Sequence, residues 1–82
     1  MLLKVVRENE TTYYIPDQIR KITISPVYGH EEEYDVAFYL DSTMEIVKVC
    51  NSYVDAENCV RHIYQLMKNT SSDEIISLDD LK

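Results

Sequence analysis

The spacing of apolar residues along the chain changes near Val54. Before that point apolar and polar positions mostly alternate, which is the period of β-strands. From residue 55 to residue 68, apolar side chains recur every three or four positions, which is the period of an amphipathic helix. This order predicts a small sheet closed by a single helix that packs on one of its faces.

Three short strands are predicted in the first part of the chain. Residues 2–7 and 11–15 are rich in β-branched and aliphatic side chains, and the polar residues between them are typical of a hairpin turn. Pro16 ends the second strand, because proline lacks the N–H that a central strand needs. Residues 19–25 predict a third strand, with Ile22 and Ile24 on one face and Thr23 and Ser25 on the other. Ile19 does not fit this alternation and is assigned to the turn, with a β-bulge as the alternative.

The clearest strand is predicted over residues 34–40. Its side chains alternate between two faces, with Tyr34, Val36, Phe38 and Leu40 on one and Asp35, Ala37 and Tyr39 on the other. Phe38 is expected at the centre of the core. Tyr39 is expected on the opposite face, where its large side chain would be available to a partner.

The last predicted strand, over residues 44–51, is partly apolar on both faces. Met44, Ile46 and Cys50 are assigned to one face by their spacing, and Val47 and Val49 to the other. One face is expected to meet the helix. The other, with Val47 pointing outward, is expected to be covered by the N-terminal hairpin or by a second subunit.

The predicted helix begins at Asp55, a favourable N-cap residue. Glu57 and Arg61 lie four positions apart on its wet side and form a pair worth about 0.3 kcal/mol. The inward stripe consists of side chains at helical spacing: Ala56, Cys59, Val60, Ile63 and Met67, with Leu66 beside them.

Together these elements predict an α+β fold with about five short, mainly antiparallel strands in one sheet or roll and the helix packed on one face. The element order is similar to that of several small roll-like and PH-like domains, an analogy that carries no function. Residues 1–69 are assigned to one domain and residues 70–82 to an acidic C-terminal tail. The tail either pairs back on the sheet as a last strand or is a flexible peptide that adds a strand to a partner's sheet.

Charge narrows the choice of partners. The net charge of −7 is uneven, since residues 1–30 carry four basic and three acidic side chains, whereas residues 31–82 carry four basic and twelve acidic ones. The negative electrostatic field of this charge distribution repels nucleic acid and anionic membranes. We therefore expect a protein partner with a basic surface, and neither direct nucleic-acid binding nor membrane binding. No apolar run approaches a signal peptide or a membrane span, so a cytoplasmic location is expected.

No catalytic residue, cofactor or metal site is predicted. Cys50 and Cys59 have neither Cys-x-x-Cys nor zinc-finger spacing, and we interpret both as small core residues, with a disulfide between them as the alternative. Cys59 and His62 share a helix face, but an apolar stripe raises a thiol pKa and suppresses its reactivity. His30 and the three glutamates after it are not expected to converge on one metal ion, because successive side chains on an extended chain point in opposite directions.

The expected partner-binding residues come from three segments. An exposed loop around the only glycine joins tyrosines to an acidic run, Tyr39 lies on the second strand face, and aliphatic side chains recur in the acidic tail. These residues are Tyr28, Glu31, Glu32, Glu33, Tyr34, Tyr39, Ile75, Ile76 and Leu78.

Two functions fit these features. The first is a small, acidic, non-enzymatic protein-interaction module, with homodimerisation through a strand edge or the second apolar face as one of its forms. The second is an acidic inhibitor of the phage or mobile-element type, which places carboxylates where the phosphates of a nucleic acid would lie and so blocks a basic nucleic-acid-binding protein.

Overall fold

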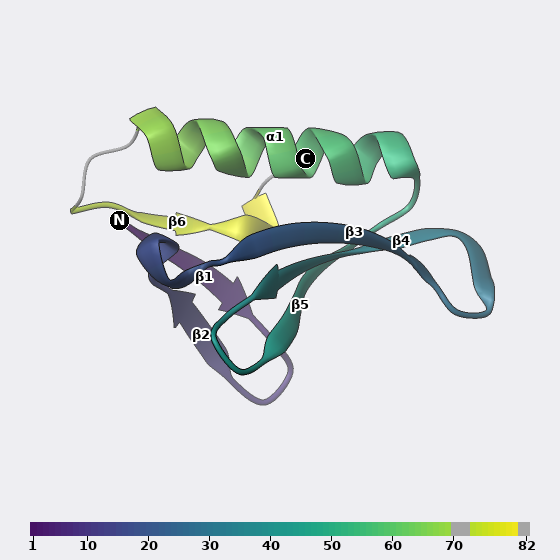
Figure 1. The fold of residues 1–82 in the computed structure, drawn as a ribbon, viewed down its shortest axis with the longest axis horizontal. Helices are drawn as coiled ribbons and strands as arrows, with labels where there is room; N and C mark the ends of the chain where they lie inside the picture. The colour runs from purple at the N-terminus through teal and green to yellow at the C-terminus, as the bar shows by residue number, and fades with distance from the viewer. Residues whose placement is uncertain (70–72, 81–82) are drawn as a thin grey trace.

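The computed structural model describes residues 1–69 and 73–80, which are arranged as one helix above two small sheets (Figure 1). The elements are β1 (Leu2–Val6), β2 (Thr11–Tyr14), η1 (Pro16–Gln18, a 3-10 helix), β3 (Lys21–Val27), β4 (His30–Tyr39), β5 (Met44–Cys50), α1 (Tyr53–Asn69), β6 (Ile75–Ser77) and η2 (Leu78–Asp80, a 3-10 helix). The predicted α+β class is confirmed. The prediction of about five strands in one sheet or roll is met only in part, because the described residues form six strands in two sheets of three.

The N-terminal sheet has the strand order β2-β1-β6. β1 and β2 form the predicted antiparallel hairpin, whereas β6 runs parallel to β1, with Ile76 opposite Leu3. Parallel neighbours need a long crossover, which β3, β4, β5 and α1 supply. Residues 75–77 of the predicted tail thus form a last strand; its residues 70–72 and 81–82 lie outside the described part of the chain.

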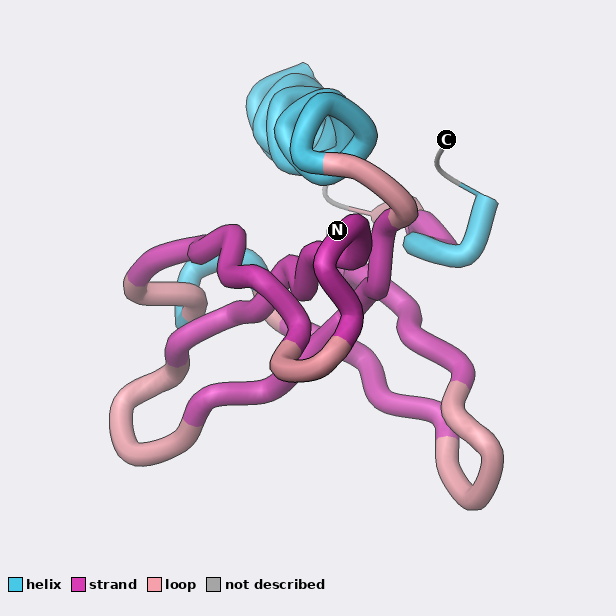
Figure 2. The backbone as a smooth tube through the Cα atoms, turned by 90° about the vertical axis from the view of Figure 1, so that its right-hand side faces the viewer, coloured by secondary structure: helices cyan, strands magenta, loops and turns pink. Residues whose placement is uncertain are grey.

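The meander sheet has the strand order β3-β4-β5, and both of its strand pairs are antiparallel. Ile22 and Ile24 of β3 lie opposite Phe38 and Val36 of β4, so these four side chains share the inner face, which α1 covers. Figure 2 looks roughly along the axis of α1 and shows the strands of both sheets on the same side of it.

A β-bulge in β5 changes which of its side chains face the core. Val36 lies opposite Lys48, but Ala37, the next residue of β4, lies opposite Ile46, so Val47 is an extra residue. An extra residue reverses the alternation along the strand. Val47 is therefore buried in the core, and the prediction that it points outward is wrong.

The same bulge separates the side chains that were predicted to share a face with Cys50. Cys50 is buried, but Met44 and Ile46 are about half exposed on the outer face of the sheet, away from α1. Val49 is exposed beside them. β5 is consequently apolar on both of its faces, as the sequence indicated, but with a different set of residues on each.

The helix begins two residues before the predicted start, because Ser52 and not Asp55 caps it. The hydroxyl oxygen Oγ of Ser52 accepts a hydrogen bond from the backbone N–H of Asp55 at 3.0 Å, and its carbonyl oxygen accepts one from Ala56 at 3.1 Å. Asp55 lies in the first turn, where its negative charge favours the N-terminus. In the described part of the chain, no helix is both long and apolar enough to cross a membrane.

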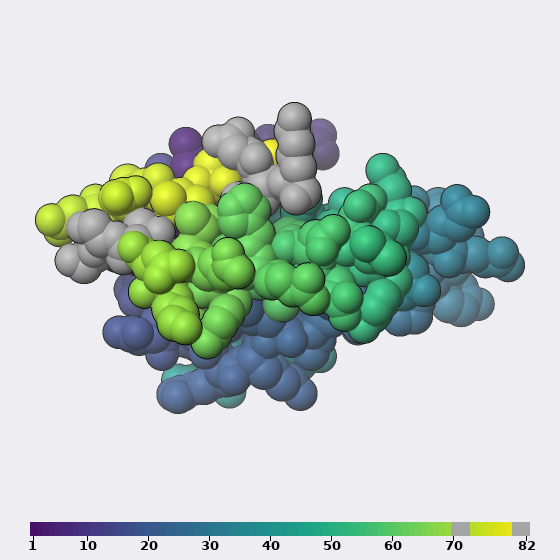
Figure 3. Space-filling model, turned by 90° about the horizontal axis from the view of Figure 1, so that it is seen from above, coloured from purple at the N-terminus to yellow at the C-terminus, as the bar shows by residue number. Residues whose placement is uncertain are grey.

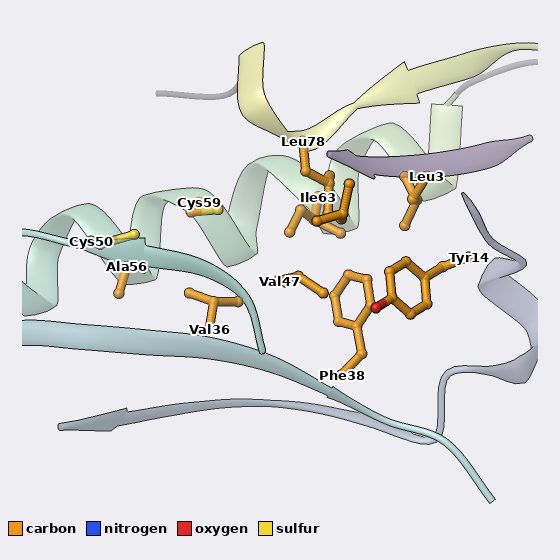
Figure 4. Packing of buried hydrophobic residues seen from close by; sticks show 11 residues of the cluster. Leu3, Tyr14, Val36, Phe38, Val47, Cys50, Ala56, Cys59, Ile63 and Leu78 are labelled. Carbon is orange, nitrogen blue, oxygen red and sulfur yellow. The ribbon is translucent and has the colours of Figure 1, made fainter. Parts of the chain in front are cut away.

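The core lies between α1 and the two sheets (Figure 4). Phe38 is fully buried in it, as predicted, and the ring of Tyr14 meets it edge-on with the centroids 5.2 Å apart. Leu78 of η2 is also fully buried in this cluster. Leu78 was predicted as a partner-binding residue, but its side chain is not on the surface, because the parallel pairing of β6 carries it into the core. The helix contributes Ala56, Cys59 and Ile63.

Candidate functional site

The last residues of β3 and the first residues of β4 project from the body of the protein as a hairpin. We call this hairpin the acidic arm (residues 26–34). β5 first pairs with β4 at Tyr34, so residues 30–33 of β4 extend past the end of β5. Figures 1 and 3 show this hairpin extending beyond the N-terminal end of α1. Gly29 closes its turn with φ of +82°, a conformation that glycine adopts without strain. Tyr28, beside it, is fully exposed at the tip.

The three glutamates of the arm lie in an irregular part of β4. Pro26 of β3 lies opposite Tyr34, and Val27 lies opposite His30, so residues 31–33 have no counterpart in β3. The pairing of β3 with β4 is therefore irregular at the three glutamates. With His30 and Asn51, the three glutamates line an open hollow of about 500 Å³. Among the described residues, no group of three or more His, Cys, Asp or Glu side chains is placed to hold a metal ion.

Tyr34 joins the arm to the rest of the protein. Its ring lies edge-on to that of Tyr53 in the first turn of α1, with the centroids 5.5 Å apart. Tyr34 is half-buried at this contact, which packs the start of the helix against the base of the arm. Of the predicted partner-binding residues in this segment, Tyr34 therefore has a packing role, whereas Tyr28 and Glu31 to Glu32 are exposed.

The negative charge of the chain is concentrated in the meander sheet. Residues 22–47 contain six acidic side chains and neither Lys nor Arg, which accounts for −6 of the net charge of −7. Two of the six are held by cations: Asp41 accepts a hydrogen bond from Arg20 at 2.6 Å, which lowers the pKa of its carboxyl, and Glu45 lies 3.8 Å from Arg7.

The other four acidic side chains lie on the arm and at its base. His30 Nδ1 lies 3.5 Å from a carboxylate oxygen of Glu33. Within the described part of the chain, none of the ion pairs formed involves Glu31, Glu32 or Asp35. The arm and its base therefore hold three neighbouring carboxylates, those of Glu31, Glu32 and Asp35, that form no ion pair in the described part of the chain.

A second polar cluster fastens the N-terminal sheet to β5. The guanidinium of Arg7 donates to the hydroxyl oxygen of Thr12 at 2.8 Å, to that of Tyr14 at 2.7 Å and to the carbonyl of Ile46 at 2.9 Å. The hydroxyl of Tyr14 donates to Glu45 at 2.5 Å. Burial, followed by the bond to Glu45, raises the pKa of Tyr14. Because these side chains bond to one another and join the N-terminal sheet to β5, we interpret this cluster as structural.

Replacing Tyr14 with phenylalanine is expected to lower the free energy of unfolding by about 1 to 2 kcal/mol at neutral pH, because the hydroxyl both donates and accepts. Since its pKa is raised in the folded state, the phenol contributes fully below pH of about 10, and this contribution is lost as pH rises through the folded-state pKa. Urea unfolding between neutral and alkaline pH tests both points, with Tyr13→Phe, half exposed, as the control. Equal effects of the two variants would contradict the role of the cluster.

Cys50 and Cys59 face each other across the contact between β5 and α1 (Figure 4). Both are buried, as predicted, and both are free thiols. Burial raises the pKa of each thiol. A buried thiol with a raised pKa is a poor nucleophile, and His62 is exposed on the helix surface.

The remaining predicted binding residues lie away from the arm. Tyr39 is half-buried on the outer face of the meander sheet, where the ammonium of Lys21 lies 4.5 Å from the centre of its ring. Ile75 is exposed on β6, and Ile76 is half-buried opposite Leu3. The nine predicted residues thus do not form one site: the arm, the outer sheet face and the N-terminal sheet are separate places.

Comparison of the chain with protein-family models, with curated proteins and with solved structures found no match. A fold does not by itself imply a function, so the function has to be argued from a site on the fold. We take the acidic arm as that site.

Proposed function

We propose that the protein is a small non-enzymatic module that binds a protein partner with a basic surface through the acidic arm. The observation that carries this proposal is the arm itself, a projecting hairpin with an exposed tyrosine at its tip and two glutamates, Glu31 and Glu32, that form no ion pair in the described part of the chain. A cytoplasmic location is part of this proposal.

The side chains of the arm suit such a contact. Glu31 and Glu32 present carboxylates that pair with Lys or Arg of the partner, and the charge of the whole arm speeds the encounter. Tyr28 adds a large aromatic surface, over which a cation can also pack. The turn and the irregular segment of β4 expose these groups together, and the core is not disturbed when they are contacted.

The proposal that the protein is non-enzymatic rests on the low reactivity of its two cysteine thiols. Cys59 is 1% exposed, and its raised pKa keeps it as a neutral thiol at physiological pH. Cys50 is also buried, and burial raises the pKa of its thiol as well. The hollow beside the acidic arm and the one beside Arg7 and Met44 are both open, whereas small-molecule sites usually bury most of the ligand surface.

Removing two charges from the arm, in Glu31→Gln with Glu32→Gln, is expected to weaken binding of the partner roughly 3- to 30-fold, since each exposed ion pair contributes up to about 1 kcal/mol. The tagged protein serves as bait in lysate of its own source, and affinity is then measured with the purified prey. Glu8→Gln with Asp17→Asn is the matched control, because it removes the same charge from exposed positions outside the arm.

Salt is the second test of the same site. Affinity is expected to fall as ionic strength rises from about 0.05 to 0.5 M, because exposed charges are then screened at shorter distances. If both double variants weaken binding equally, the net charge and not the arm is responsible. Binding that does not depend on salt would rule out the acidic arm as the contact.

The acidic inhibitor remains the second candidate, and the concentration of charge in residues 22–47 is the observation that favours it. It requires that the prey itself bind nucleic acid and that the protein compete with DNA or RNA for it. A prey that binds nucleic acid and this protein at the same time would leave only the first proposal.

A further inference from the structure

The face of the meander sheet that points away from α1 carries a row of apolar side chains. We call it the outer face. Met44, Ile46 and Val49 of β5 are 49%, 44% and 51% exposed there. The buried Ala37 and the half-buried Tyr39 of β4 lie beside these three side chains, since the register places Ala37 opposite Ile46 and Tyr39 opposite Met44. Adjacent exposed apolar side chains of this kind are typical of an interaction surface.

The bulge in β5 is what places these side chains together. With Val47 as the extra residue, Ile46 and Val49 both face outward, while Val47 and Cys50 both face the core. A surface strand of an antiparallel sheet usually has one apolar and one polar face. β5 has two apolar faces, and the described part of the chain covers only one of them.

A partner reaches this surface by stacking on the face and not by adding a strand to β5. The guanidinium of Arg7 donates to the carbonyl of Ile46 at 2.9 Å, which fills an acceptor at the edge of β5. Further along, the ammonium of Lys48 donates to the carbonyl of Leu78 at 3.3 Å and ties η2 to the same strand. Pairing by another strand would have to break both contacts.

We propose that the occupant of the outer face is a second copy of this chain, stacked face to face with its strands reversed. The charges of the face are complementary to themselves in this arrangement. Lys21 lies at one end, opposite Tyr39, and Asp35 lies at the other end, four residues or about 13 Å along β4. Reversal brings Lys21 of each copy to the Asp35 end of the other, with the apolar row between them.

The acidic arms favour the same arrangement. Each arm continues β4 beyond Asp35, so reversed strands send the two arms to opposite ends of the dimer. Strands stacked in the same direction would place the two arms side by side, where their like charges repel. The dimer would present two arms, and a partner with two basic sites would bind it with avidity. This inference goes beyond the proposed function, because the arm can bind a partner whether or not the protein is a dimer.

Ile46→Asp is expected to convert a dimer into a monomer while far-UV circular dichroism stays unchanged, because its side chain is on the surface. Sedimentation equilibrium of the full chain from about 1 µM to 1 mM is expected to give twice the chain mass for the wild type, and a dissociation constant raised at least about tenfold for the variant. Met44→Asp is the second variant should the first fail to fold. Tyr13→Asp, equally exposed but on the N-terminal sheet, is the control and is expected to remain dimeric.

Charge reversal tests the orientation. Lys21→Asp and Asp35→Lys are each expected to raise the dissociation constant, and the double variant to restore it. A wild type that is monomeric throughout, a dimer that survives both outer-face variants, or one lost in Tyr13→Asp would overturn the proposal. Failure of the double variant to restore association would overturn the reversed arrangement. None of these results depends on the basic partner, so they leave the proposed function to its own test.

Discussion

Replacing Phe38 with alanine is expected to lower the free energy of unfolding by about 3 to 5 kcal/mol, the usual cost of truncating a buried aromatic side chain. Phe38 is fully buried, and the ring of Tyr14 packs edge-on against it. A chain of 82 residues has a total stability of roughly 4 to 12 kcal/mol. The variant is therefore expected to lose much or all of its folded population near room temperature.

Urea unfolding followed by far-UV circular dichroism measures this loss. Tyr28→Ala is the matched control, because it also removes an aromatic side chain but from the exposed tip of the arm. Its free energy of unfolding is expected to stay within about 0.5 kcal/mol of the wild type. A Phe38→Ala protein as stable as this control would show that the centre of the core lies elsewhere.

Local periodicity was enough to predict most of the elements. All but the last residue of the alternation over residues 34–40 falls within β4, and the apolar stripe over residues 55–68 falls within α1. Phe38 could be assigned to the core on the same ground. These features depend on residues close together in sequence, which is why a single chain reveals them.

The faces of β5 and the start of α1 were predicted wrongly, because in each case a single residue decides between two arrangements that fit the sequence equally well. Apolar side chains occur at both parities of β5, so the alternation carried no signal for the bulge at Val47. Ser52 and Asp55 are both good N-caps, and their spacing matches a capping box, which was the available signal for the earlier start.

Long-range pairing was the other source of error. The parallel register between β1 and β6 joins residues more than seventy positions apart, and nothing local indicates it. The cluster of Arg7, Tyr14 and Glu45 likewise unites three separate segments. For the candidate site the outcome differs by segment: the residues of the arm are neighbours in sequence and were predicted together, whereas the burial of Leu78 depends on the crossover that returns β6 to β1.

Replacing Leu78 with alanine is expected to lower the free energy of unfolding by about 2 to 5 kcal/mol, in the range of buried leucines. Leu78 is fully buried against the core, although it lies in the last part of the chain. β6 pairs with β1 over only three residues, so its own hydrogen bonds provide little stability. We expect Leu78 to anchor this strand, and the loss of its side chain to free β6 and expose Leu3 on β1.

The matched control for Leu78 is Ile75→Ala, three residues earlier, where the side chain is 58% exposed on β6. This variant is expected to change the free energy of unfolding by less than about 1 kcal/mol. Hydrogen exchange gives a second measurement, since the amides of β1 and β6 are expected to lose protection in Leu78→Ala before those of the meander sheet do. If both variants are as stable as the wild type, residues 73–80 do not contribute to the fold in solution. The tail would then be the free peptide that was the alternative, available to add a strand to a partner.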